Sequence, residues 1–127
     1  MVYLQSQLQE IFMTIREFYE KIGADYNDAL SRLISENLVS RFVRKFPADP
    51  TMQSLRDSIA EGKIEESFRA VHTLKGVAGN LAFTRLYQAC WDLTEQLRPR
   101  EQQADPVLME VLEKEYEKTV RLIEELQ

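Results

Sequence analysis

Apolar residues recur at intervals of three and four along most of this 127-residue chain. That spacing places them on one face of an α-helix, whereas a strand would alternate apolar and polar residues. The clearest example runs from about residue 64 to residue 81. Its apolar stripe consists of Phe68, Val71, Leu74, Ala78 and Leu81. The pattern predicts one helix over about residues 64–81, with this stripe facing the core.

The N-terminal 23 residues have the same periodicity. Their apolar positions are Leu4, Leu8, Ile11, Ile15, Phe18 and Ile22. Phe12 and Tyr19 add a second apolar column, so the buried face is broad, and Gly23 favours a stop. We expect residues 1–23 to form an accessory helix, which either covers the rest of the domain or mediates self-association.

Two short helices are expected after Gly23. Asp25 or Asn27 is suited to cap the first, which ends near Ile34, and Ser35 is suited to begin the second. The apolar face of the second helix is expected to contain Leu38, Phe42 and Phe46. Prolines then interrupt the pattern, so the second helix should end near residue 46.

Helix starts also divide the rest of the chain. The dipeptides Asp49-Pro50 and Asp105-Pro106 each place an N-cap residue before a proline, which is typical of the first helical position. Thr84 is suited to cap the helix between residues 84 and 97. These starts predict one helix after each of the three positions.

Together the patterns predict an all-α fold, an antiparallel four-helix bundle with an additional N-terminal helix or helices. Gly62 is expected to end one helix, and the next opens at Lys63 and Ile64 after a tight turn. These two helices should therefore be antiparallel neighbours. We expect residues 1–127 to form one domain with the bundle in residues 25–126, because this length suffices for one core. Cys90 lies on an apolar stripe and is expected in that core, while Trp91 lies at its edge, where it either packs or marks a contact surface.

Composition narrows the class of protein. Apolar residues make up 44% of the chain, which argues against disorder, and the net charge of −5 without a basic block argues against nucleic acid as a partner. The single cysteine excludes an internal disulfide and fits a reducing compartment. No apolar run approaches the roughly 20 residues of a membrane helix, and no signal peptide is recognised. We expect a monomeric cytoplasmic protein without membrane insertion.

The expected helix over residues 64–81 carries a second, unusual face. Its members are His72, Lys75, Gly76 and Gly79, at positions i, i+3, i+4 and i+7. His72 is the only histidine and directly follows core-side Val71, so it should stand exposed at the edge of the stripe. Two glycines inside a helix cost roughly 1 kcal/mol each relative to alanine. Such departures from local preference mark either tight packing or a working site.

This second face supports a narrow range of chemistry. A lone imidazole can serve as a base, a metal ligand or a nucleophile, but no Cys/His cluster is present for zinc, so no metal is expected. Lys75 and Arg69, one turn to either side of His72, disfavour a cation and suit an imidazole that accepts a phosphoryl group. Gly76 leaves space for a large partner to reach the ring. The face therefore indicates an accessible phosphoryl acceptor.

The stretch from His72 to Gly76, with the small residues and Asn80 that follow, resembles the signature of histidine-containing phosphotransfer (HPt) domains. The resemblance covers about residues 25–98 in order. Residues 26–33 and 37–46 resemble the helices before the family's phosphohistidine hairpin, and residues 86–97 resemble the helix that follows. Two positions depart from the pattern: Val77 stands where the family often has a smaller residue, and Ala82 where it often has glycine. We expect Val77 to influence which partner docks.

The resemblance implies a phosphorelay intermediate in two-component signal transduction. Through its Nε2 atom, His72 would take a phosphoryl group from an aspartyl phosphate on a response-regulator receiver domain and pass it to another receiver. Lys75 and Arg69 would stabilise the phosphoryl group, and Gly76 and Gly79 would give the partner access. The chain would be a carrier without enzymatic activity, since it has no kinase motif or nucleotide-binding loop. It would need no cofactor of its own, with Mg²⁺ bound by the receiver, and its partners would be receiver domains and a hybrid sensor histidine kinase.

Three other interpretations remain open from the sequence. The first is a docking module that binds receivers or kinases through the same surface without phosphotransfer. The second is a hydrolase with His72 as general base, which would need an orienting carboxylate from another helix. The third is a purely structural helical bundle, which would require His72 to be buried.

Overall fold

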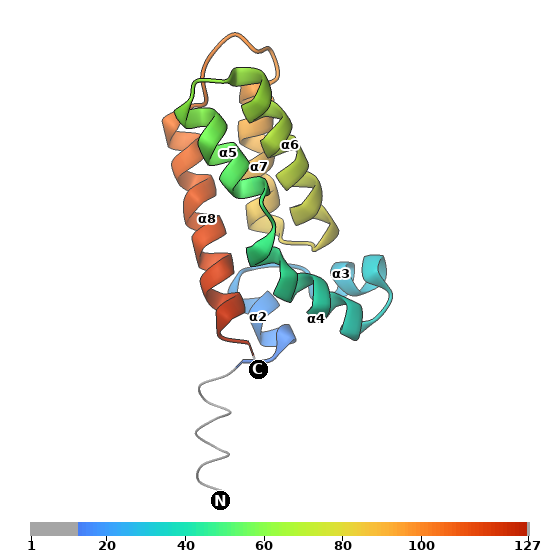
Figure 1. The fold of residues 1–127 in the computed structure, drawn as a ribbon. Helices are drawn as coiled ribbons and strands as arrows, with labels where there is room; N and C mark the ends of the chain where they lie inside the picture. Colours follow the sequence, from blue (N-terminus) through green and yellow to red (C-terminus); the bar gives the residue numbers. More distant parts are fainter. Residues whose placement is uncertain (1–12, 127) are drawn as a thin grey trace, which may run out of the picture.

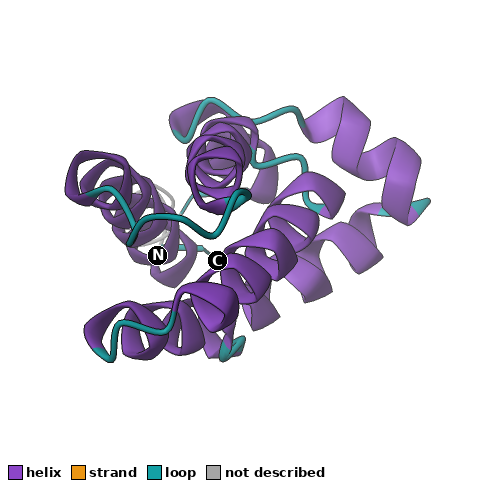
Figure 2. Cartoon of the chain, turned by 90° about the horizontal axis from the view of Figure 1, so that it is seen from above, coloured by secondary structure: helices purple, strands orange, loops and turns teal. Residues whose placement is uncertain are grey.

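The computed structural model describes residues 13–126. Within these residues the chain is helical, and the one β feature is an isolated bridge between Met13 and Leu126 (Figures 1 and 2). The elements in order are α2 (Ile15–Lys21), α3 (Tyr26–Leu33), α4 (Glu36–Lys45), the 3₁₀-helix η1 (Phe46–Ala48), α5 (Thr51–Ala60), α6 (Ile64–Asn80), α7 (Thr84–Leu97) and α8 (Pro106–Glu124). The expected all-α class is confirmed. The accessory helix expected over residues 1–23 lies outside the described residues up to residue 12. In the described part it needs a correction: helix α2 begins only at Ile15, because Met13 pairs with Leu126 and Thr14 is extended and caps α2.

Four helices, α5, α6, α7 and α8, lie side by side in Figure 1. α6 packs between α5 and α7, and α7 also packs against α8. Tight turns join α5 to α6 and α6 to α7, so each pair runs in opposite directions. The smaller helices α2, α3 and α4 gather at the end of this group where α6 finishes. In this arrangement, the part of α6 that faces solvent borders α7.

Side-chain caps account for several of the helix starts. Asp25, Ser35 and Asp105 each accept a hydrogen bond from a backbone N–H in the first turn of their helix, as expected. Thr84 does not cap α7 as expected. It is the first helical residue, and its hydroxyl donates to the Ala82 carbonyl oxygen at 3.3 Å. Without a side-chain cap at Phe83, the start of α7 depends on the packing of the preceding turn.

The core contains the expected stripe of α6, since all five of its apolar residues are buried. The expected face of α4 needs a correction. Phe42 is 46% exposed, whereas Val39 and Val43 are fully buried. The two columns of α4 are both apolar and adjacent on the helix, so periodicity alone does not decide which one faces the core. Tertiary packing selects the Val39 column and leaves Phe42 at the surface.

A buried polar contact also joins α5 to α6. The Ser67 hydroxyl donates to the Ser58 hydroxyl oxygen at 3.0 Å, and both side chains are almost fully buried. The Ser58 hydroxyl in turn donates to the Leu55 carbonyl oxygen, so neither group is left without a partner. Buried hydroxyls are stable in a core only when they are paired in this way.

The C-terminal end of α6 is held by the N-terminal helices. The Tyr19 hydroxyl of α2 donates a buried hydrogen bond of 2.8 Å to the Leu81 carbonyl oxygen. The Asp25 backbone N–H donates to the carbonyl oxygen of Ala82, the next residue. Ala82 itself has φ of 55°, in the left-handed region that favours glycine, which gives a structural reason for the family's preference at this position. These contacts fix the turn from α6 into α7.

No helix in residues 13–126 combines the length and the apolar character that crossing a bilayer requires. The described surface is instead rich in charged residues paired at helical spacing, such as Arg32 with Asp28 and Lys114 with Glu110. Such exposed pairs contribute about 0–1 kcal/mol each to stability.

Candidate functional site

His72 lies near the middle of α6 and is exposed to solvent. Val71 and Leu74, the nearest members of the core stripe along the chain, are 0% and 1% exposed. This difference is what the one-residue offset from the core stripe predicts, and it removes the observation, a buried histidine, that would favour the purely structural interpretation. Among the described residues, no side chain forms a hydrogen bond with either nitrogen of the imidazole.

One aromatic side chain packs beside the imidazole. Phe68, one helical turn before His72, has its ring centroid 5.9 Å from the imidazole centroid with the planes inclined at 33°. Phe68 is 8% exposed, and two guanidinium groups from the loop after α7 lie over its ring. The Arg100 group is 3.5 Å from the Phe68 centroid and the Arg98 group is 5.4 Å from it. The Phe68 ring thus contacts the imidazole of His72 and two cations from the chain after α7.

Lys75 lies on the α7 side of the His72 face. Its Nζ atom is 4.8 Å from the centroid of the Trp91 ring, which is a cation–π contact between α6 and α7. Lys75 is half-buried and Trp91 is 42% exposed. Lys75 follows His72 by three residues, so the two side chains share one surface of α6. Lys75 is therefore one helical turn from His72, and among residues 13–126 no carboxylate lies within 4.0 Å of its ammonium group.

Arg69 has a different environment from Lys75. Its Nε atom donates to the Glu65 carboxylate at 2.9 Å, one turn toward the N-terminus of α6. The second oxygen of Glu65 accepts from Arg100 Nε at 2.8 Å. These bonds from Arg100 and Arg69 lower the pKa of the Glu65 carboxyl below its usual value. Arg69 is thus paired with a carboxylate one turn before it on α6, whereas His72 lies one turn after it. Its role toward a phosphoryl group stays a prediction.

The two glycines of the face have unlike surroundings. A Cβ atom at Gly76 would meet no atom within 4 Å, so this position is open beside His72. A Cβ atom at Gly79 would lie 3.2 Å from Cε2 of Tyr87. Gly79 therefore permits close packing of α6 on α7. Its role in partner access stays a prediction, whereas the clearance expected at Gly76 is present in the structure.

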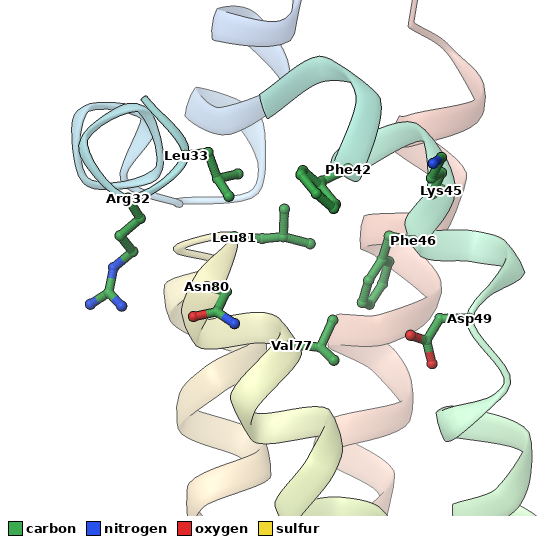
Figure 3. Close-up of a pocket in the computed structure, with 9 residues that line it drawn as sticks. All are labelled: Arg32, Leu33, Phe42, Lys45, Phe46, Asp49, Val77, Asn80 and Leu81. Carbon is green, nitrogen blue, oxygen red and sulfur yellow. The ribbon is translucent and has the colours of Figure 1, made fainter. Parts of the chain in front are cut away.

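A groove of about 590 Å³ adjoins the C-terminal half of α6 (Figure 3). Its apolar lining comes from Leu33, Phe42, Phe46, Val77 and Leu81, and its polar lining from Arg32, Lys45, Asp49 and Asn80. Val77, the residue where the sequence departs from the family pattern, points into this groove in Figure 3. A side chain of this size contributes apolar surface where a smaller residue would leave more space.

Sequence reasoning did not find every residue around His72. Arg98 and Arg100 lie between the helices predicted over residues 84–97 and after residue 105, and Phe68 belongs only to the predicted core stripe. Trp91 was recognised as a residue at the edge of its stripe, with no sign of the helix opposite. Phe68 meets His72 within α6, whereas Trp91 reaches Lys75 from α7, and Arg98 and Arg100 reach the Phe68 ring from the chain after α7. No periodic signal within one helix could have identified such contacts.

The donor set of the described residues also bears on metal binding. Within residues 13–126, no group of three or more His, Cys, Asp or Glu side chains is arranged to hold a metal ion. The carboxylates of Glu65 and Glu95 are instead bound by arginines, as in the bond of 2.8 Å between Arg98 and Glu95. The arrangement suits a transient anion on the imidazole.

Comparison with protein families agrees with the site. The family model of the Hpt domain matches residues 38–122, which include His72 and extend from α4 into α8. Because the match covers well over half of the chain, the chain belongs to the Hpt domain family. Hpt domains act in two-component phosphorelays as carriers of a phosphoryl group. No curated protein and no solved structure shows significant similarity to the chain.

Proposed function

We propose that this protein is a phosphorelay intermediate that carries a phosphoryl group on Nε2 of His72. The observation that carries the proposal is the exposed imidazole, with open space at Gly76 and with Lys75 one helical turn along α6. The donor would be the aspartyl phosphate of a receiver domain, and the acceptor an aspartate of another receiver. In this proposal α5, α6, α7 and α8 are the antiparallel four-helix bundle, within a single domain that spans residues 1–127.

The transfer step uses few groups of this chain. The lone pair of Nε2 forms a bond to phosphorus as the P–O bond to the aspartyl group breaks, and the electron pair of that bond leaves with the carboxylate. The ring keeps its proton on Nδ1 until it exchanges with solvent. Lys75 offsets the charge of the phosphoryl oxygens, and Arg69, Arg98 and Arg100 add a positive potential nearby. The receiver would supply Mg²⁺, so the chain acts as substrate and carrier.

The surroundings of His72 favour this proposal over a hydrolase. A general base needs an orienting carboxylate, and among the described residues none forms a hydrogen bond or ion pair with His72, while Glu65 and Glu95 are bound by arginines. The docking module without phosphotransfer uses the same fold and surface, so an experiment has to separate it from the carrier. We further propose that the protein works in the cytoplasm as a monomer, with receiver domains and a hybrid sensor kinase as partners.

The test is phosphotransfer from a phosphorylated receiver domain, followed by analysis of acid-labile phosphate on the chain. We expect the wild-type protein to take up phosphate and His72→Gln to take up none. Thr73→Ala, which changes the neighbouring exposed residue, is the matched control and should behave as wild type. Because His72 is exposed, His72→Gln should change the free energy of unfolding by less than about 0.5 kcal/mol. Receiver binding without phosphate uptake by the wild type would favour the docking module instead.

A further inference from the structure

The α7 side of the His72 face is formed by two aromatic rings. Tyr87 and Trp91 lie one turn apart on α7, with ring centroids 6.2 Å apart. Tyr87 contacts the position of Gly79, and Trp91 lies under the ammonium group of Lys75. Trp91 is one of the large apolar side chains that the described residues leave exposed, at 42%. It is thus an exposed ring at the edge of the proposed acceptor site, with a cation on its face.

Lys75 has no stronger partner than this ring among the described residues. No carboxylate there lies within 4.0 Å of its Nζ atom, although Glu95 is on the same side of α7. Glu95 is already bound by Arg98 through contacts of 2.8 to 3.2 Å, which lower the pKa of its carboxyl more than Lys75 does. Lys75 therefore keeps its net positive charge available for an anion that arrives on His72.

We infer that Trp91 is a positioning residue for Lys75: its ring holds the ammonium group beside His72 in the unphosphorylated protein and releases it to the phosphoryl group. This inference rests on the proposed function for its second half. An exposed cation–π contact is weak compared with a charge-assisted hydrogen bond to phosphoryl oxygens. Since Lys75 follows His72 by one turn, rotation of its side chain suffices to exchange one partner for the other.

The same exchange changes the environment of Trp91. The chain has a single tryptophan, so its fluorescence reports on this ring alone. A cation on the face of the ring in one state, and its absence in the other, alters the emission. The methylene protons next to Nζ of Lys75 report the contact from the other side, because an aromatic ring shifts the resonances of protons above its face upfield. These two signals follow the contact without depending on receiver binding.

The experiment uses the full chain and phosphoramidate as the phosphoryl donor. The Nε2 lone pair attacks phosphorus, the P–N bond of the N-protonated donor breaks, and ammonia leaves with the electron pair. Phosphohistidine is measured by ³¹P NMR, with His72→Gln as the variant that should show none. Before the donor is added, we expect the Lys75 methylene protons to be shifted upfield in the wild type. This shift should be absent in Trp91→Leu and partly restored in Trp91→Phe, which keeps a ring.

After phosphorylation, we expect the Lys75 resonances to move back downfield and the Trp91 emission to change. Lys75→Met keeps an unbranched side chain without charge and should show a much smaller change in emission at equal phosphohistidine content. Unshifted Lys75 protons in the free wild type would overturn the inference, and so would Lys75 signals that stay upfield after phosphohistidine has formed. If no phosphohistidine forms, the proposed function fails, and the release half of the inference fails with it. The contact between Lys75 and Trp91 is still decided by the signals of the free protein.

Discussion

Gly79 and Tyr87 lie so close that a Cβ atom added to the glycine would be 3.2 Å from Cε2 and 3.3 Å from Cδ2 of the ring. Gly76, three residues earlier on the same helix, has nothing within 4 Å of its Cβ position. The two glycines of the His72 face therefore serve different purposes in the structure. One allows α6 to approach α7, and the other leaves the surface beside the imidazole empty.

Substitution of Gly76 should separate stability from access. Gly76→Ala is expected to stabilise the domain by up to about 1 kcal/mol, because alanine has the higher helix propensity and meets no neighbour. Gly76→Gln should also fold, since glutamine is a good helix former, but its side chain should slow phosphotransfer from a receiver. Urea denaturation and transfer kinetics measure the two effects. Normal transfer by Gly76→Gln would mean that the partner approaches from another side.

Substitution of Gly79 should give the opposite balance. Gly79→Ala has the same propensity gain of about 1 kcal/mol, but the Tyr87 ring must move by a few tenths of an ångström. We expect Gly79→Ala to be less stable than Gly76→Ala in urea denaturation. In a double-mutant cycle, Tyr87→Leu should recover part of the difference for position 79 and none for position 76. Equal stability of the two alanine variants would remove the packing role of Gly79.

The two cations expected to stabilise a phosphoryl group should differ in effect. Lys75→Ala should slow transfer by roughly ten- to a hundredfold, the equivalent of one hydrogen bond to a charged group at about 1.5–3 kcal/mol. Arg69→Ala should have a smaller effect, because Glu65 binds Arg69 at 2.9 Å on the side away from His72. Stopped-flow phosphotransfer at matched protein concentrations gives both rates. A larger loss for Arg69→Ala would show that Arg69 exchanges Glu65 for the phosphoryl group.

The hydrogen bond from Tyr19 to Leu81 should matter for stability and little for chemistry. Tyr19→Phe keeps the ring but leaves the buried Leu81 carbonyl oxygen without its donor, which costs about 1–3 kcal/mol. Phosphate uptake by His72 should persist under conditions where the variant is folded, since Tyr19 acts at the far end of α6. Chemical denaturation and acid-labile phosphate measure the two properties. Unchanged stability would mean that water replaces the hydroxyl at this site.

The single cysteine gives a prediction about pH. Burial raises the pKa of the Cys90 thiol to about 12, while Lys75 lowers it slightly. The unfolded thiol has a pKa of about 8.5, so the folded state favours the protonated form. The contribution of Cys90 to stability is therefore constant below about pH 8.5 and decreases as the pH rises toward about 12. Denaturation at a series of alkaline pH values should show a shallower decline for Cys90→Ala than for wild type. In the folded wild type at neutral pH, a disulfide reagent should react with Cys90 only slowly.

The sequence by itself determined the parts of this protein that depend on local geometry. The stripe of α6 and the exposure of His72 follow from the period of 3.6 residues, because a helix fixes the direction of each side chain relative to its neighbours. The caps Asp25, Ser35 and Asp105 follow for the same reason, since their hydrogen bonds reach only two or three residues along the chain. The residues around His72 also carried the resemblance to the family.

Other features were decided only by the tertiary structure. The position of Trp91 under Lys75, the rings and cations around Phe68, and the choice of Val39 over Phe42 for the core all depend on how one helix is placed against another. Periodicity shows which side of a helix is apolar. Where two adjacent columns are equally apolar, it does not show which column faces the core, and it does not show how far the helix is shifted along its neighbour. Both are set by the sum of many packing contacts that are distant in sequence. For this reason the acceptor itself could be predicted from the chain, while the side chains that surround it required the packed structure.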